Sequence, residues 1–354
     1  MAFHLGCLRA LSDLGILENV SVLSTISGGS VIGAYYAYTP EKSFAEFEAA
    51  IRLILRRGFH NQITRELLAP LNMLAGLRDL STSALQSALS RLHLGGTLPQ
   101  RHRSRTDLFR SVLRDAVFGD LQLTSPRRCD MEVVIGACEL RTGSAFRFSS
   151  QSVGGWRHGQ AINADTDLAF AVTASAAYPL LLPALDRTWK FLKKGIESEQ
   201  RILLTDGGIY DNLGVPVLEP GRSADFSLHH FECDHLIVCS AGRGQEAGTS
   251  LPTRFLGRVS QSFDVVHRRV QDSTMQRLHQ LKQNRVIKGF SLPYLGQQDS
   301  RLPHKPPDLV PRSAVVGYRT DFAPMKDEWI DRLSSRGEQL TRLLVPHYLS
   351  SICN

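Results

Sequence analysis

The sequence predicts an α/β protein whose central sheet is largely parallel. Segments of helical periodicity alternate along the chain with short, predominantly apolar runs at residues 20–26, 132–138 and 235–240. Strands that are hydrophobic without alternation are typical of parallel sheets, because helices bury both of their faces. A length of 354 residues and a hydrophobic fraction of 42% allow a large core.

The predicted elements follow one another in a simple order. A first helix is predicted over residues 3–17, where leucine recurs at helical spacing, and it leads into a strand at 20–26. The other predictions are helices at 31–37, 167–179, 255–270 and 329–344, strands at 132–138, 146–148, 201–205 and 235–240, and a loop at 293–311.

Residues 1–354 are interpreted as a single domain, because the chain contains no internal repeat and no long linker. Residues from about 41 to 120 are rich in leucine and arginine, and we interpret them as a helical insertion over the mouth of a site. Residues from about 251 to 354 are predicted to be a C-terminal helical region of the same domain.

The chain is basic, with a formal net charge of +7 and a pI near 9.2. Such a charge favours anionic surfaces, either lipid head groups or nucleic acid. No zinc-finger spacing or lysine-rich tail supports nucleic acid, so we expect none as a partner. The basic run at 101–105 is expected to be a solvated loop, and the alternative is contact of its arginines with phospholipid phosphates. The six scattered cysteines are expected to be reduced thiols.

No segment of the sequence has the pattern of a membrane anchor or a secretory signal. Residues 168–185 carry no charge, but Pro179 and Pro183 would break a spanning helix. The first residues include His4 and Arg9 and therefore lack a continuous apolar core. We expect a cytoplasmic protein, or at most a peripheral membrane protein.

The transition from the strand at 20–26 to the helix at 31–37 has the pattern of a nucleophile elbow. It passes through Ser27, Gly28 and Gly29, and a strained strand-to-helix turn needs such small residues beside the nucleophile. Ser27 is the candidate nucleophile, the N–H of Gly28 a candidate oxyanion-hole donor, and Gly29 the close-packing position. The elbow pattern has glycine where this chain has Thr25. The alternative interpretation is an ordinary turn that joins a strand to a helix.

The second candidate is Asp206, which ends a short apolar strand and is followed by Gly207 and Gly208. Strand ends are where open α/β sheets gather their sites, and the two glycines leave the carboxylate room to face a substrate. A carboxylate takes a serine proton where water is excluded and the oxyanion is stabilised. The competing histidine triad would draw on one of the histidines after Asp206, at positions 229, 230, 235, 267, 279, 304 and 347.

With these residues placed, four stretches show a family resemblance. They are the helix at 5–17, Thr25-Ile26-Ser27-Gly28-Gly29-Ser30, Ala174-Ser175-Ala176-Ala177-Tyr178-Pro179, and Asp206-Gly207-Gly208 with Tyr210-Asp211-Asn212. In these motifs and their order the chain resembles the patatin-like phospholipases of the bacterial type. The resemblance implies a three-layer α/β/α sandwich and a lipid acyl hydrolase. Its dyad would be Ser27 and Asp206, with no metal, no cofactor and a lipid or phospholipid as the substrate.

The start of the sequence departs from this family. Its members place a glycine-rich loop, which supplies most oxyanion donors, before the first helix, whereas Met1 already lies in the predicted helix. Loss of one such donor typically costs ~10²–10³ in rate. We therefore expect either that the protein begins upstream or that this form is impaired and binds a lipid or a partner without turnover. A third hypothesis is hydrolysis of small esters or thioesters. The oligomeric state stays open.

Overall fold

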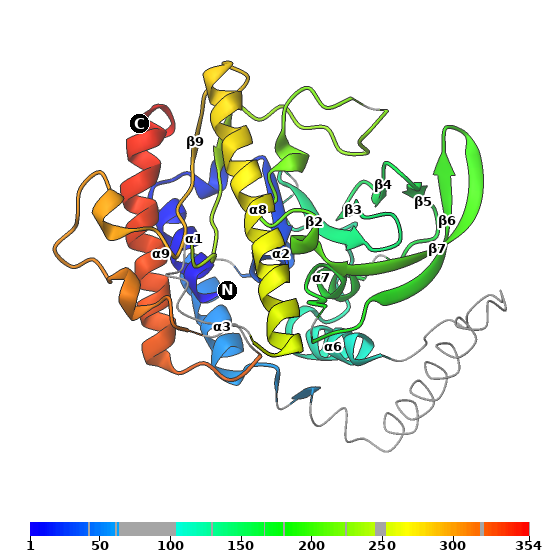
Figure 1. Cartoon of the computed structure of the whole chain (residues 1–354), viewed down its shortest axis with the longest axis horizontal. Coiled ribbons are helices and arrows are strands. Elements are labelled where there is room, and N and C mark those ends of the chain that lie inside the picture. Colours follow the sequence, from blue (N-terminus) through cyan, green and yellow to red (C-terminus); the bar gives the residue numbers. More distant parts are fainter. Residues whose placement is uncertain are drawn as a thin grey trace.

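The computed structural model (Figure 1) describes residues 1–41, 43–60, 62–63, 104–128, 130–165, 167–179, 181–223, 225–244, 253–318 and 322–353. Most of the helical insertion predicted at 41–120, including residues 101–103 of the basic run, lies outside these residues. The described part of that region contains the helices α3 (Phe44–Arg57) and α6 (Arg105–Leu113).

The prediction of a largely parallel sheet in a three-layer α/β/α sandwich is wrong. Six consecutive strands pair antiparallel with their neighbours, and the last pairs back on the first, so that they close into a ring. The strands of the ring are β2 (Glu132–Glu139), β3 (Ser144–Ser149), β4 (Val153–Gly155), β5 (Gly159–Ala161), β6 (Leu185–Lys193) and β7 (Ile196–Asp206).

Parallel pairing is limited to two places among the described strands. β1 (Val22–Ile26) is a parallel neighbour of β2, and β8 (His235–Ile237) pairs with β9 (Gly289–Ser291) in a separate two-stranded sheet. The strand predicted at 235–240 is therefore present but does not belong to the main sheet.

Short connections explain why β6 pairs antiparallel with β7 and β2 with β3. β6 and β7 are joined by Lys194 and Gly195, whose φ angles of 50° and 79° are those of a tight hairpin turn. β2 and β3 are joined by residues 140–143, of which Gly143 has a φ of 60°. Parallel neighbours need a crossover of a dozen or more residues, and these connections are too short for one.

The apolar run at 132–138 predicted a parallel strand buried on both faces. β2 is indeed buried along nearly its whole length. That burial has another cause here. The ring folds around aromatic side chains, and the fully buried helix α7 (Leu168–Ser175) packs against it. The aromatic contacts join Phe146 and Phe148 of β3 to Trp189 and Phe191 of β6 and to Phe170 of α7.

The two ends of the chain form one helical layer beside the strands (Figure 1). α1 (Ala2–Asp13) packs against α9 (Asp327–Tyr348), and their backbones come very close. A Cβ built on Gly6 would lie 1.8 Å from the carbonyl oxygen of Ser334, so only glycine fits there.

Arg9 ties three helices of this layer together. Its Nε donates to Glu48 of α3 at 2.9 Å, and its Nη1 donates to Glu338 of α9 at 2.6 Å. These side chains are about four-fifths buried, so the ion pairs are screened less than surface pairs would be.

The helices predicted at 3–17, 31–37, 255–270 and 329–344 are confirmed with shifted bounds, and residues 293–311 lack extended secondary structure as predicted. Among the described helices, none combines the length and hydrophobicity needed to cross a bilayer.

The remaining elements are α2 (Gly28–Tyr38), α8 (Phe255–Gln283), the turn η2 (Arg114–Phe118), and the short turns η1 (Leu17–Asn19), η3 (Gly207–Ile209), η4 (Pro216–Leu218), η5 (Asp299–Arg301), η6 (Arg312–Ala314) and η7 (Ser350–Ile352).

Candidate active site

Two strands run toward each other along one edge of β2 and meet at the candidate site. β1 is parallel to β2 and its last residue, Ile26, pairs with Gly136. β7 is antiparallel to β2 and its last residue, Asp206, pairs with Ala137. β3 occupies the other edge of β2 over this stretch, so β1 and β7 share one edge. Their ends meet there, because Gly136 and Ala137 are consecutive residues of β2. Ser27, which follows β1, is thereby brought against Asp206.

Ser27 links β1 to α2 through a backbone conformation that L-residues rarely adopt. Its φ is 52° and its ψ is −131°, and it is one of three non-glycine residues with positive φ in the described part of the chain. Such a conformation costs roughly 1–3 kcal/mol and persists only where the surroundings impose it. The strand–turn–helix arrangement predicted around Ser27 is therefore present, and it is strained.

Ser175, at the end of α7, holds this strained turn. Its hydroxyl accepts the backbone N–H of Ser27 at 2.9 Å and donates to the carbonyl oxygen of Gly136 at 2.6 Å. Because the Ser175 proton is used on Gly136, Ser30 of α2 must be the donor in the 2.8 Å contact between the two serine hydroxyls. Both serines are fully buried. Ser175 was named from the sequence only within the family motif at 174–179, and the polarity of this residue among alanines was the missed signal.

Asp206 accepts a hydrogen bond from the hydroxyl of Ser27. Ser27 Oγ donates to Asp206 Oδ2 at 2.7 Å, and the backbone N–H of Gly208 donates to Asp206 Oδ1, also at 2.7 Å. Asp206 is only 4% exposed, and this burial raises its pKa to about 6, while the two hydrogen bonds oppose the rise. The carboxyl group is thus ionised at neutral pH and is more basic than an exposed aspartate.

Gly207 and Gly208 let Asp206 take this position. A Cβ on Gly207 would lie 2.3 Å from the carbonyl oxygen of Gly136, so the chain passes against β2 where only glycine fits. A Cβ on Gly208 would come within 2.9 Å of Asp206 Oδ1 and would crowd the carboxylate.

Gly28 leaves the space beside Ser27 open. It is exposed, and a Cβ placed on it would meet no atom within 4 Å. It begins α2, so its N–H belongs to the first turn, where helix N–H groups have no partner inside the helix. The positive end of the α2 dipole adds to its ability to receive a developing negative charge.

The departure from the elbow pattern at Thr25 is compensated on α2. The methyl group of Thr25 lies 2.4 Å from the position that a Cβ on Gly33 would take, so this glycine makes room for the threonine. Gly29 was the predicted close-packing position. A Cβ added there would meet only a ring atom of His4, at 4.0 Å, so nothing in the described part of the chain packs closely against Gly29. The tight approach between the elbow strand and the helix therefore lies at Gly33, one turn further along α2.

Two of the histidines considered for a triad, His267 and His229, have defined surroundings. His267 of α8 borders the aspartate motif, with its Nε2 3.1 Å from the Cβ position of Gly208. His229 contacts the hydroxyls of Ser152 and Ser149 through its Nε2, at 3.1 and 3.2 Å, and burial lowers its pKa to about 3. The Ser27 hydroxyl itself goes directly to a carboxylate.

A cavity of about 1370 Å³ opens above the two residues. Ser27, Gly28 and Asp206 are part of its wall, together with segments from α1, β1, β8 and α8. It is larger than the roughly 300–1,000 Å³ typical of pockets for drug-sized ligands. Its apolar lining includes Ile32, Phe59, Phe109, Leu213, Val238 and Met325.

No three of the described histidine, cysteine and acidic side chains converge as metal ligands would. The groups at the candidate site are a hydroxyl, a buried carboxylate and the N-terminus of a helix beside an apolar cavity.

Comparison with known proteins places the chain in a family. No match is found among curated proteins. The crystal structure of VipD from Legionella pneumophila aligns with 98% of this chain and 65% of its own, at 13% identity and a TM-score of 0.37. This chain thus spans about 65% of the length of that protein. A family model described as patatin-like phospholipase matches residues 1–219, more than half of the 354 residues and including both Ser27 and Asp206. The chain belongs to the patatin-like phospholipase family.

Proposed function

We propose that this protein hydrolyses carboxylic ester bonds of lipids, with Ser27 as the nucleophile and Asp206 as the general base. The observation that carries the proposal is the 2.7 Å hydrogen bond from Ser27 Oγ to Asp206 Oδ2, made at a strained strand-to-helix turn in the wall of the cavity. The family is one of esterases and phospholipases, which supports a lipid acyl hydrolase in general.

In the first half of the reaction, Asp206 Oδ2 takes the proton of Ser27 Oγ as this oxygen attacks the ester carbonyl carbon. The carbonyl oxygen becomes an oxyanion at the N-terminus of α2, where the N–H of Gly28 is the candidate donor. When the tetrahedral intermediate collapses, the protonated carboxyl group of Asp206 gives its proton to the leaving alcohol. The products are an acyl-serine at Ser27 and a free alcohol.

In the second half, water attacks the acyl carbonyl carbon and Asp206 takes a proton from it. Collapse of this second intermediate breaks the bond to Ser27 Oγ, and the proton returns from Asp206 to the serine. The fatty acid leaves and the original state is restored, so that the net reaction is ester plus water to acid plus alcohol.

The pKa of Asp206 suits this role. A general base works best when its pKa lies near the operating pH. With a pKa of about 6, Asp206 is ionised at neutral pH. Its carboxylate is a stronger base than that of an exposed aspartate and is therefore better able to take the proton of the serine hydroxyl. The apolar lining of the cavity supports acyl chains as the part of the substrate that is bound.

The proposal is tested with a fluorophosphonate probe, which labels only an activated serine, beside hydrolysis of a short-chain ester and of phospholipid vesicles. We expect Ser27→Ala to abolish labelling and both hydrolyses, and Asp206→Asn to reduce each of them strongly. Ser21→Ala is the matched control, because Ser21 is an exposed serine just before the same strand.

Labelling that survives in Ser27→Ala would disprove the role of this serine. If the folded wild-type protein binds lipid but neither labels nor turns over an ester, it is a lipid-binding member of the family. Turnover of short-chain esters or thioesters without turnover of phospholipid would restrict the substrate to small molecules.

A further inference from the structure

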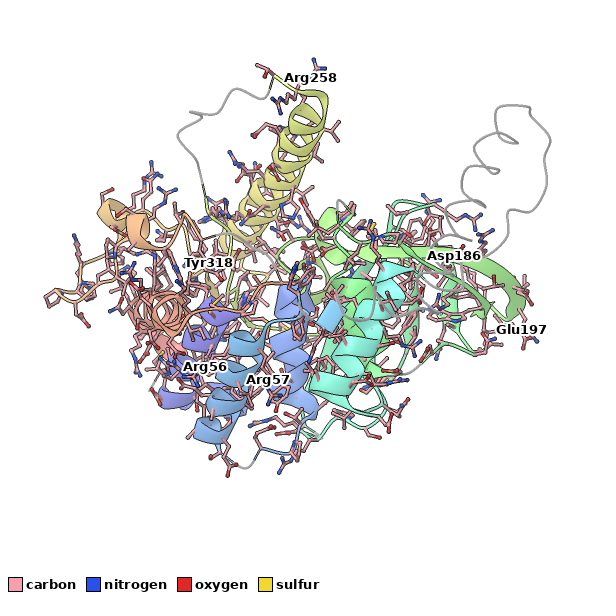
Figure 2. The ribbon with its side chains drawn as sticks, turned by 90° about the horizontal axis from the view of Figure 1, so that it is seen from below. Arg56, Arg57, Asp186, Glu197, Arg258 and Tyr318 are labelled. Carbon is pink, nitrogen blue, oxygen red and sulfur yellow. The ribbon has the colours of Figure 1, made fainter. Side chains whose placement is uncertain are left out.

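The two halves of α8 differ in how they are held. The C-terminal half is anchored by Thr274, Leu278 and Leu281, which are buried, and the two leucines pack in one cluster with Val215 and Leu236. In the N-terminal half, no described side chain of residues 257–271 is buried. Figure 2 shows α8 standing out from the body of the molecule, with Arg258 at its projecting end.

The projecting half carries a stripe of apolar and cationic side chains. Val259, Val265 and Val266 are 41%, 55% and 61% exposed. Exposed Arg258 and Arg269 lie on the same side, because at 3.6 residues per turn the five residues fall within about 120° of arc. We call Arg258, Val259, Val265, Val266 and Arg269 the α8 stripe.

The other side of the same helical segment belongs to the active-site cavity. Gln261, Asp264, His267, Arg268 and Gln271 line the cavity, and they fall on the opposite part of the helix circumference from the α8 stripe. One short segment thus presents a wall to the cavity and a stripe to the surroundings. A surface that binds the α8 stripe therefore also determines how the cavity is oriented relative to that surface.

We propose that the α8 stripe docks on an anionic phospholipid surface. The valines would enter the boundary between head groups and acyl chains, while the two arginines contact lipid phosphates. A helix with an apolar strip beside arginines is suited to this boundary, and each basic residue near an anionic leaflet contributes about fivefold to binding. The net charge of +7 acts in the same direction.

Docking in this orientation has a consequence for the active site. It would place α8 between the bilayer and the cavity, so that the cavity lies one helix away from the membrane that holds its substrate. This part of the inference rests on the proposed function, whereas the docking itself does not.

The docking is tested by sedimentation with vesicles of phosphatidylcholine alone or mixed with phosphatidylserine. Ser27→Ala serves as the background, so that no lipid is consumed. We expect Arg258→Gln with Arg269→Gln to weaken binding to the anionic vesicles about 30-fold, since two cationic contacts are lost. Val265→Ser with Val266→Ser should weaken binding at least about tenfold, because buried apolar area is lost.

Matched controls remove the same groups elsewhere. Arg56→Gln with Arg57→Gln neutralises two exposed arginines at the end of α3, away from the projecting helix in Figure 2. Val286→Ser replaces a valine that is 45% exposed and lies outside the stripe. Both controls should bind vesicles within about twofold of the parent, because Val286 lies outside the α8 stripe and salt screens the distant charges of Arg56 and Arg57.

A second measurement separates docking from catalysis. In the presence of Ser27, variants of the stripe should hydrolyse a soluble short-chain ester at the wild-type rate and lose hydrolysis of vesicle phospholipid in proportion to binding. Wild-type protein that ignores anionic vesicles, or stripe variants that bind as the controls do, would overturn the inference. If the soluble ester is never hydrolysed, the proposed function fails while the vesicle binding still decides the docking.

Discussion

The methyl group of Thr25 occupies the place that a side chain on Gly33 would need, 2.4 Å from its Cβ position. Gly33→Ala should therefore destabilise the protein by about 1–3 kcal/mol, although alanine is the better helix former. Thr25→Ser removes the clashing methyl group and keeps a hydroxyl. The double variant should recover most of the loss, with a coupling of about 1–2 kcal/mol in denaturant unfolding. Independent, additive effects of the two changes would contradict the contact.

Ser175 is expected to act on catalysis through the backbone of Ser27. Ser175→Ala leaves the Ser27 N–H and the Gly136 carbonyl oxygen without their partner, and the strained turn should relax. We expect kcat to fall about 10- to 100-fold with a smaller change in KM, as for other misplaced nucleophiles. Ser30→Ala is the matched control, because it removes one donor from the same cluster and leaves both of these bonds in place. Equal effects of the two variants would mean that the cluster acts only through packing.

Asp206 should lower stability at the pH where it works. Its folded pKa of about 6 lies above the ordinary value of 3.8, so its charging disfavours the folded state increasingly as the pH rises from 4 through 6. Asp206→Asn keeps an acceptor for the Gly208 N–H and removes the charge. The variant should be more stable than wild type by about 1–3 kcal/mol at pH 8 and should lose this advantage near pH 4. Thermal unfolding at the two pH values measures the difference, and an Asn variant that is less stable at pH 8 would contradict it.

Activity should depend on the ionisation of the same carboxyl group. On a soluble ester, kcat/KM is expected to be flat above pH 7 and to fall tenfold per pH unit below about pH 6 as Asp206 takes up a proton. Burial also raises the pKa of Asp211 to about 6. Asp211→Asn therefore serves as the control and should keep the acidic limb unchanged. A limb that disappears in this variant would assign the titration to Asp211.

The local chemistry around the site could be read from neighbouring residues in the chain. A β-branched run before Ser27 and an apolar run after it indicate a strand that turns into a helix, and both elements are present. Two glycines after Asp206 indicate a tight turn at the end of a strand, which is also present. Turn geometry and helix or strand preference depend on a few consecutive residues, so the sequence suffices for them.

The pairing of strands could not be read in this way. β6 and β7 form a hairpin in which only the second half of β7 is apolar, and its exposed first half, at 196–199, carries two glutamates. The prediction therefore found residues 201–205 alone and missed the hairpin turn at Lys194 and Gly195. The buried run of β2 then suggested helices on both faces, whereas a closed antiparallel ring and α7 bury it.

Two segments of the sequence, taken separately, thus determined a serine in a strand-to-helix turn and an aspartate before a pair of glycines. Only the tertiary structure decided that these segments meet, because Ile26 and Asp206 pair with neighbouring residues of β2 from opposite directions. The same holds for Ser175, whose hydroxyl reaches Ser27 across 148 residues of sequence. Pairing direction and register are set by contacts between distant segments, and no local pattern encodes them.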